Sequence, residues 1–241
     1  MGCISQNHDG GDLDLAVVIP TLNEERTIGV CLEAIRKASR VEVVVSDGGS
    51  TDRTPELASA AGVRVVEGAS GRGPQLNLGA RSAAAGRLLF LHADCRLPAG
   101  WLPALGTALD DEATALACFR LHTEPSGGRQ RSMLYRRWLR VFDLRSFGLG
   151  LPYGDQGFAL RREVFDRVGG FQEIPLMEDV AFARSCRRLG RIHRLSLAVR
   201  TTARRAEGHP VRTGLALATF PTLFRLGVSP STLVRWYGEV R

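Results

Sequence analysis

An apolar run in the middle of the chain ends in a carboxylate. Residues 88–98 read LLFLHADCRLP, so a segment typical of a buried strand is followed at once by His92, Asp94 and Cys95. Mg²⁺ and Mn²⁺ are hard cations that proteins usually hold through one or two carboxylates together with the phosphates of a substrate. Asp94 is therefore a candidate residue for a metal and phosphate site. The alternative is an aspartate that binds backbone amides in a turn before Pro98.

A second polar segment, SDGGSTDRT at residues 46–54, follows another apolar run. Its glycines allow a tight turn and a close approach of the backbone to a ligand, and Asp47 could accept hydrogen bonds from a nucleobase. Ser50 or Thr51 could equally cap the following helix, in which case the segment is an ordinary strand-to-helix turn. The order G-x-G-x-x-G and the lysine of a phosphate-binding P-loop are both absent, so neither nucleotide motif applies.

Two acidic residues, Glu178 and Asp179, stand at the start of an expected helix in the segment MEDVAFA. The helix macrodipole stabilises ionised carboxylates at that end, which keeps one of them competent as a general base. Helix starts also favour acids for purely structural reasons. His92 and His209 are candidate metal ligands, but a zinc site is disfavoured because no second Cys or His lies at zinc-like spacing.

These residues need a scaffold, and the pattern of apolar and helical segments in the first hundred residues predicts one. Apolar runs predict strands at 15–19, 41–45, 63–67 and 87–92, with helices at about 24–37, 53–61 and 74–85 between them. Strands without polar alternation, separated by helices, indicate an α/β fold: a doubly wound, Rossmann-like, mostly parallel sheet with helices on both faces. Ligands bind such sheets beyond the carboxyl ends of the strands. The residues expected at those ends are Thr21, Asn23, Glu24, Asp47, Arg72, His92 and Asp94.

Beyond residue 110 the pattern is less regular. We expect a strand at 115–122, a helix in 129–144, a strand and a short helix within 153–171, a helix over 177–190 and an extended segment after it. The apolar stretch 213–228, interrupted by Pro221 and Arg225, predicts a pair of core helices. Because no linker is evident, we expect a flexible tail over 1–13 and one domain over 14–241, with a nucleotide-binding half at about 14–110 and an acceptor-side half at about 111–241.

Four segments together resemble the family 2 glycosyltransferases, enzymes of the GT-A fold. In the family's order, over about residues 14–190, they are VVIPTLNEERTIGVCLEAI, VEVVVSDGGSTDRTPELA, GRGPQLNLGARSAAAGRLLFLHAD and GDQGFALRREVFDRVGGFQEIPLMEDVAFARSCRRLG. They resemble the family's opening, its nucleotide-binding second strand, the approach to its metal-binding DxD motif, and the acceptor-side segment with the catalytic carboxylate. HAD in place of DxD, and the tail RLGVSPSTLVRWYG, are similar to a bacterial subgroup.

The resemblance implies an inverting transfer of one sugar from a nucleotide-sugar donor to an acceptor hydroxyl, assisted by Mg²⁺ or Mn²⁺, with a UDP-sugar favoured by family habit. It implies that Asp179 deprotonates the acceptor with Glu178 beside it, while a metal and nearby arginines stabilise the departing diphosphate. The other implied roles are Pro20, Thr21 and Glu24 in the base and ribose pocket, Asp47 at the nucleobase, Arg72 near the nucleotide, Asp94 on ribose or metal, and Asp155 with Gln156 at the acceptor cleft.

Two departures from the family pattern matter. His92 replaces the first Asp of DxD, so Asp94 would hold the metal with water and phosphates, or together with a histidine such as His209. The Q-x-x-R-W sequence of processive members is replaced by ARRAE at 203–207, which favours transfer of a single sugar.

Other functions could use the same polar residues at the carboxyl ends of the strands. A nucleotidyltransferase usually has a glycine-rich loop with a basic residue directly after the first strand, where this chain has PTLNEER. A catalytically inactive nucleotide-binding module is the other alternative, and the presence of both Asp94 and Asp179 speaks against it. A nucleic-acid binder would leave the acidic residues at the carboxyl ends of the strands unexplained.

Charge is divided unevenly along the 241 residues. Residues 1–125 carry 11 Lys+Arg against 16 Asp+Glu, a balance of −5, whereas residues 126–241 carry 21 against 9, a balance of +12. The basic half indicates an anionic partner, although a general preference for arginine explains it equally well. Its aromatic residues would suit a lipid-linked, isoprenoid-type acceptor at a membrane surface, an ordinary soluble helix or a homodimer contact. They are Trp138, Phe142, Phe147 and Tyr153.

Five scattered cysteines and the lack of a secretory signal at the start predict a cytoplasmic protein. No apolar stretch reaches the length of a membrane-spanning helix, so any membrane contact would be peripheral, on the inner face.

Overall fold

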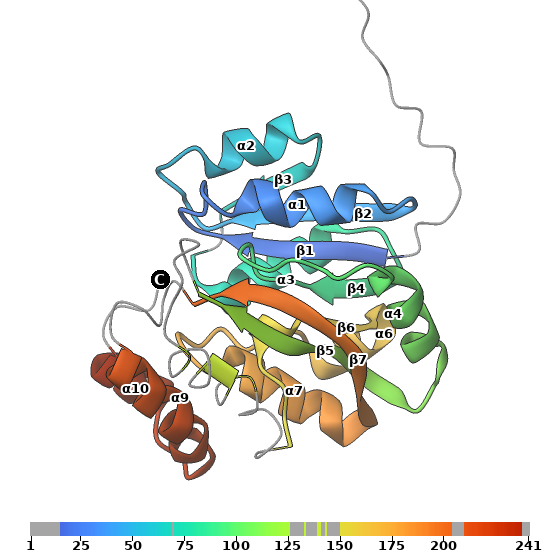
Figure 1. The fold of residues 1–241 in the computed structure, drawn as a ribbon. Coiled ribbons are helices and arrows are strands. Elements are labelled where there is room, and N and C mark those ends of the chain that lie inside the picture. Colours follow the sequence, from blue (N-terminus) through green and yellow to red (C-terminus); the bar gives the residue numbers. More distant parts are fainter. Residues whose placement is uncertain are drawn as a thin grey trace, which may run out of the picture.

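The computed structural model describes residues 15–68, 70–125, 150–203 and 210–237, together with Met133, Leu139, Arg140 and Asp143. Its centre is a seven-stranded sheet in the order β3-β2-β1-β4-β6-β5-β7 (Figure 1). The strands are β1 (Leu15–Thr21), β2 (Val41–Asp47), β3 (Arg64–Glu67), β4 (Arg87–Phe90), β5 (Thr114–Glu124), β6 (Phe158–Arg161) and β7 (Arg191–Thr202). Of these, β6 alone runs antiparallel to its neighbours, so the predicted mostly parallel sheet is confirmed.

Helices cover both faces of this sheet. On one face lie α1 (Ile28–Arg36), α2 (Thr54–Ala60) and α4 (Trp101–Asp110), and on the other lie α3 (Arg72–Ser82), α6 (Arg162–Val168) and α7 (Glu178–Leu189). A short 3-10 helix, η2 (Gly154–Gln156), precedes β6. The carboxyl ends of β1, β5 and β7 point to the same edge (Figure 1). The expected tail over 1–13 and most of the helix expected over 129–144 lie outside the described residues.

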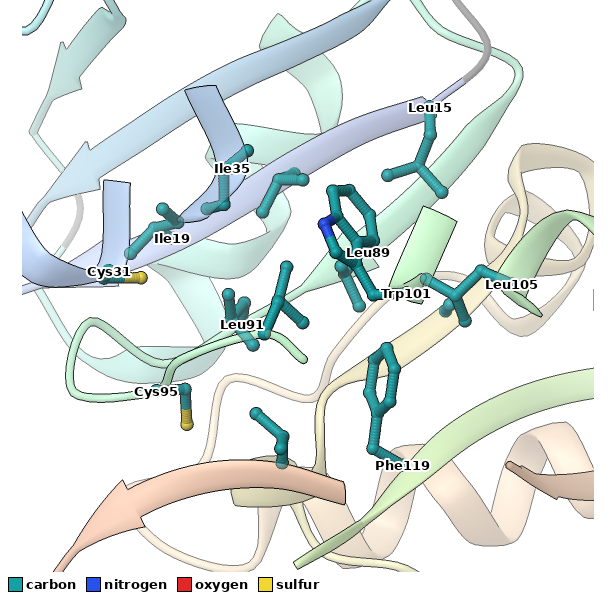
Figure 2. Close-up of a cluster of buried hydrophobic side chains, with 14 of the residues drawn as sticks. Leu15, Ile19, Cys31, Ile35, Leu89, Leu91, Cys95, Trp101, Leu105 and Phe119 are labelled. Carbon is teal, nitrogen blue, oxygen red and sulfur yellow. The ribbon is translucent and has the colours of Figure 1, made fainter. Parts of the chain in front are cut away.

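Each face of the sheet buries its own apolar cluster. In β1, Val17 packs toward α1 and α4, whereas the next residue, Val18, packs toward α3. Figure 2 shows the first cluster, to which Ile35 of α1 and Trp101 and Leu105 of α4 contribute. Because successive side chains of a strand point to opposite faces and both faces are covered, the strands have continuous apolar runs in the sequence.

Glycines bring α3 very close to its surroundings. A Cβ on Gly79 would lie 2.3 Å from Val18 Cγ1, and one on Gly73 would lie 2.4 Å from the carbonyl oxygen of Gln172. Neither position has room for a side chain. The first turn of α3 therefore lies directly against the segment 169–177, which leads into α7.

Asn77 fastens α3 to that segment. Its Nδ2 donates to the carbonyl oxygen of Phe171 at 2.9 Å, and its Oδ1 accepts from the Phe171 N–H at 2.8 Å.

We expect Asn77→Leu to lower the free energy of unfolding by about 2–4 kcal/mol, because it leaves two buried backbone groups without partners. Urea denaturation measures this loss. Arg81→Leu, at an exposed position of the same helix, should change it by no more than about 0.5 kcal/mol. Equal effects of the two substitutions would contradict the assignment.

Two further helices, α9 (Pro210–Arg225) and α10 (Pro230–Tyr237), end the described chain. The prediction of a helix pair within 213–228 is wrong, because Pro221 lies inside α9, which continues to Arg225. A proline inside a helix costs about 3 kcal/mol or more, and here the packing of Ala216 and Phe220 against Tyr153 and neighbouring residues offsets that cost. None of the described helices has both the length and the apolar character needed to cross a membrane.

Candidate active site

The loops after β1 and β2 are tied together through Asp47, whose side chain is buried. Its Oδ1 accepts hydrogen bonds from the hydroxyls of Thr21 (2.8 Å) and Ser50 (2.6 Å). Its Oδ2 accepts from the backbone N–H groups of Gly49 (3.0 Å) and Ser50 (2.7 Å). A carboxylate has about four lone-pair sites, so these bonds use its acceptor capacity. Nucleobase recognition by Asp47 stays a prediction, and it requires one of these donors to give way to a base N–H.

Gln75 of α3 binds the ends of the two strands that lead into these loops. Its Nε2 donates to the carbonyl oxygens of Thr21 (2.6 Å) and Ser46 (2.9 Å), and Ser46 pairs with Pro20 across β1 and β2. A Cβ on Gly48 would lie 2.9 Å from the same Nε2, so the glycine allows the loop to pass over the amide. Gln75 is not among the residues predicted for the site. The available signal was a polar residue within the stretch PQLNLG of a helix that packs on the sheet.

The β1–α1 loop is similarly fixed to the β2–α2 loop. Glu24 is buried; its backbone N–H donates to Thr54 Oγ1 at 2.8 Å, and its Oε2 accepts from Thr27 Oγ1 at 2.8 Å. Asn23 donates its backbone N–H to Ser50 Oγ at 2.9 Å. The residues predicted to line a base and ribose pocket are thus brought together in one hydrogen-bonded pair of loops.

Arg72 and Glu178 form an ion pair between α3 and α7. Arg72 Nη1 lies 3.0 Å from Glu178 Oε1, and the exposed fractions of the two side chains are 26% and 2%. Burial lowers the pKa of the arginine, but the negative charges of Glu178, Asp179 and Asp94 raise it above its ordinary value. Arg72 is therefore a fixed cation between the acidic start of α7 and the turn that follows β4.

Asp179 is a half-buried carboxylate at the start of α7. Its Oδ2 accepts a hydrogen bond from the Gly154 N–H at 2.9 Å, and its Oδ1 accepts one from the Val180 N–H at 2.7 Å. Burial, and next the negative charge of Glu178, raise the pKa of Asp179 to about 6, although Arg72 and the two amides act in the opposite direction. A carboxylate with this pKa is ionised at neutral pH and accepts a proton more readily than an ordinary aspartate.

Asp94 lies in the turn after β4, where its charge acts on Arg72. His92 approaches the η2 segment: a Cβ on Gly154 would lie 3.1 Å from His92 Nε2. His209 lies outside the described residues, as do Trp138, Phe142 and Phe147. Over the described part of the chain, no group of three or more His, Cys, Asp or Glu side chains is placed to hold a metal ion.

The η2 segment carries Asp155 and Gln156. Gln156 is buried; its Nε2 donates to the Phe119 carbonyl oxygen at 2.9 Å, and its Oε1 accepts from the Tyr153 N–H at 2.9 Å. The Gln156 amide is thus bonded to the chain itself, and the border of an acceptor cleft at Asp155 and Gln156 stays a prediction. Burial raises the pKa of Cys95, whose thiol lies 3.6 Å from the carbonyl oxygen of Asp155 and links the Asp94 turn to this segment.

Gly154 sits between His92 and Asp179. Its Cβ, if present, would lie 3.3 Å from Asp179 Cβ and 3.4 Å from Asp179 Oδ2. We expect Gly154→Ala to lower kcat about tenfold or more while leaving nucleotide affinity unchanged, because it displaces Asp179, the predicted general base, by a fraction of an ångström. Steady-state kinetics with a fixed donor measures the effect. The matched control is Gly86→Ala, where a Cβ meets no atom within 4 Å; comparable losses in both variants would contradict this role.

The sheet order and the helices on both faces define the GT-A fold, and solved structures agree. The mannosyltransferase PcManGT from Pyrobaculum calidifontis, in complex with GDP-Man and Mn²⁺, superposes with a TM-score of 0.65 at 18% identity, covering 95% of this chain and 69% of that one. Glucosyl-3-phosphoglycerate synthase from Mycobacterium tuberculosis, with Mn²⁺, UDP and phosphoglyceric acid, gives a TM-score of 0.58 at 25% identity, covering 89% of this chain and 79% of that one.

The family follows from the sequence match. Residues 16–169 match the model of glycosyl transferase family 2, and the chain belongs to that family. A dolichyl-phosphate hexose transferase of Haloferax volcanii is 33% identical over 156 aligned positions, and the alignment covers 61% of this chain and 65% of that protein. The chain thus spans slightly less than two thirds of that relative's length.

Proposed function

We propose that the chain transfers one hexose from a nucleotide-sugar donor to a hydroxyl group of its acceptor, with inversion at the anomeric carbon. The observation that carries this proposal is Asp179, a carboxylate with a pKa of about 6 that lies beside the cation Arg72. Family membership and the GT-A fold support the same reaction.

In this reaction Asp179 is the general base. It takes the proton of the acceptor hydroxyl as the acceptor oxygen bonds to the anomeric carbon, and the bond from that carbon to the diphosphate breaks on the opposite face. A positioned base of this kind contributes about 10²–10⁴-fold to a rate. The hydrogen bonds from Gly154 and Val180 orient the carboxylate, and Glu178 maintains its proton affinity through negative charge.

The donor would occupy the edge formed by the loops after β1, β2 and β4. Arg72 is suited to bind the departing diphosphate, because a guanidinium matches phosphate geometry. Asp94 fits a cation of the Mg²⁺ or Mn²⁺ type, which needs only one or two carboxylates when substrate phosphates supply the remaining ligands. Such a cation would neutralise charge on the diphosphate when bound. Structures in complex with GDP-Man and with UDP both share this fold, and the panel below distinguishes the donor base.

For the acceptor we propose an amphiphilic, isoprenoid-type lipid bearing the reacting hydroxyl. The name of the Haloferax volcanii relative, a dolichyl-phosphate hexose transferase, supports a lipid of this class. The basic balance of residues 126–241, 21 Lys+Arg against 9 Asp+Glu, supports an anionic group on it.

A thermal-shift panel of nucleoside diphosphates and nucleotide sugars, with and without Mn²⁺, tests the donor site. A ligand at a hundredfold its dissociation constant adds about 2.7 kcal/mol of stability, which for a chain of this size raises Tm by about 5–10 °C. We expect one nucleotide to give this shift with Mn²⁺, and Asp94→Ala to remove the Mn²⁺-dependent part. Asp166→Ala, an exposed carboxylate on α6, should leave it intact. If no nucleotide shifts Tm, the donor site is refuted.

A further inference from the structure

The outward side of α9 has an unusual composition for a surface helix. Leu215, Ala218 and Thr222 of α9 are exposed, as is Leu226 in the turn that directly follows it, and they recur at intervals of three or four residues, so they form one stripe. Leu215 is 65% exposed and Leu226 is 77% exposed. The solvent side of an amphipathic helix is normally charged or polar. This stripe therefore exposes two large apolar side chains where charged or polar ones are usual.

Cationic and aromatic side chains accompany the stripe. Arg225 is exposed at the end of α9, and on α10 the exposed residues are Arg235 and Trp236, with Trp236 56% exposed. Residues 210–237 contain three arginines and no aspartate or glutamate. We define Leu215, Arg225, Leu226, Arg235 and Trp236 as the α9–α10 surface. Apolar residues with a tryptophan and flanking arginines form the composition of segments that lie in a membrane interface.

The inner side of the same two helices is attached to the catalytic edge. Ala216, Phe220 and Leu233 pack in one buried cluster with Tyr153 and Met177. Tyr153 immediately precedes Gly154, which bonds Asp179, and Met177 immediately precedes Glu178. Figure 1 places α9 and α10 at the same edge of the molecule as the carboxyl ends of β1, β5 and β7. The α9–α10 surface is therefore on the active-site side of the molecule.

Charge distinguishes an anionic bilayer from a second copy of the chain. In a two-fold symmetric dimer the same surface packs against its own copy, which would bring together two surfaces that carry arginines, with no acidic residue of 210–237 on either of them. An anionic membrane surface supplies the opposite charge, and each arginine close to it adds to the attraction. The apolar stripe and Trp236 can then insert at the boundary between headgroups and acyl chains.

We propose that the α9–α10 surface docks the protein on an anionic lipid bilayer and so holds the active-site edge at the membrane. The inference of docking depends only on the composition and position of this surface. Its use, to receive the reacting group of a lipid acceptor beside Asp179, rests on the proposed function.

Vesicle flotation tests the docking with the full chain. We expect binding to vesicles of phosphatidylcholine with 30% phosphatidylglycerol at 50 mM NaCl, weak binding to phosphatidylcholine alone, and loss of binding at 500 mM NaCl. Leu226→Glu/Trp236→Glu should lower the partition coefficient at least about tenfold, because it removes inserted apolar groups and adds repelling charge. The charge-matched control, Val30→Glu/Leu189→Glu, alters exposed apolar residues of α1 and α7 and should retain binding.

Several results would overturn the proposal. They are absence of flotation with the anionic vesicles, equal binding of the Leu226→Glu/Trp236→Glu variant, or a stable dimer that this variant dissociates in sedimentation equilibrium. Circular dichroism confirms that each variant folds. The nucleotide-dependent shift in Tm, measured on the same samples, separates the two proposals, because it reports the donor site and is independent of lipid docking.

Discussion

Asp179→Asn is expected to lower kcat by about 10²–10⁴-fold, the contribution of a positioned general base, while the dissociation constant for the donor nucleotide stays within about twofold. The asparagine keeps the size of the side chain and one acceptor for the Gly154 or Val180 amide, but it cannot take a proton. Donor binding by calorimetry and transfer by product formation measure the two quantities separately. The matched control is Glu163→Gln, an exposed carboxylate of α6.

The pH profile distinguishes a base from a structural aspartate. Because burial and Glu178 raise the pKa of Asp179 to about 6, the base is protonated and inactive below that pH and ionised above it. We expect kcat to rise with pH through about 6 and then to reach a plateau, and this acid limb to be absent from the residual rate of Asp179→Asn. An unchanged limb in the variant would contradict the assignment.

The same variant also identifies the chemistry of the acceptor. A hydroxyl must lose its proton as it attacks, whereas the oxygen of a phosphate monoester is already ionised at neutral pH. Full activity of Asp179→Asn, with donor binding intact, would therefore refute the hydroxyl acceptor and indicate attack by a lipid phosphate.

Arg72→Met is expected to lower the free energy of unfolding by about 2–4 kcal/mol, since breaking one side of a buried ion pair leaves an uncompensated charge. The remaining charge is on Glu178, which is 2% exposed, and the partial exposure of Arg72, 26%, places the effect below that of a fully buried pair. Urea denaturation at pH 7.5 measures the loss.

A double-mutant cycle tests this explanation. Arg72→Met/Glu178→Gln should recover at least half of the lost stability, because the glutamine carries no charge to desolvate. In the single variant the acid limb of kcat should also move to higher pH, because Arg72 lowers the pKa of Asp179. Additive effects in the cycle would show that the two residues do not act as a pair.

The scaffold of this site was predictable because strand and helix patterns are local. The runs at 15–19 and 41–45 lie on strands β1 and β2, and the helix over 177–190 is α7. Parallel strands with helices between them place their carboxyl ends at one edge, which is why Asp47, Arg72 and Asp94 could be assigned to that edge from order alone. In contrast, no sequence pattern predicted that β6 would lie between β4 and β5 and pair with both of them in the antiparallel direction.

The functions of polar side chains were less predictable, because they depend on partners far away in the chain. Asp47 and Gln156 have the residue types of ligand-binding groups, yet their side chains are buried in bonds to the chain itself. Asn77 and Gln75 were missed for the converse reason: their partners, such as Phe171, lie up to 94 positions away.

The sequence by itself therefore determined the α/β class, the edge that carries the candidate site residues and the family, since these follow from periodicity and short motifs. Only the tertiary structure decided that Arg72 neutralises Glu178, that Gly154 lies between His92 and Asp179, and that α9 continues through Pro221. Each of these depends on burial and on charges between segments distant in the chain. A carboxylate acquires its pKa from the solvent it loses and the charges it meets, and a linear sequence specifies neither until the chain has folded.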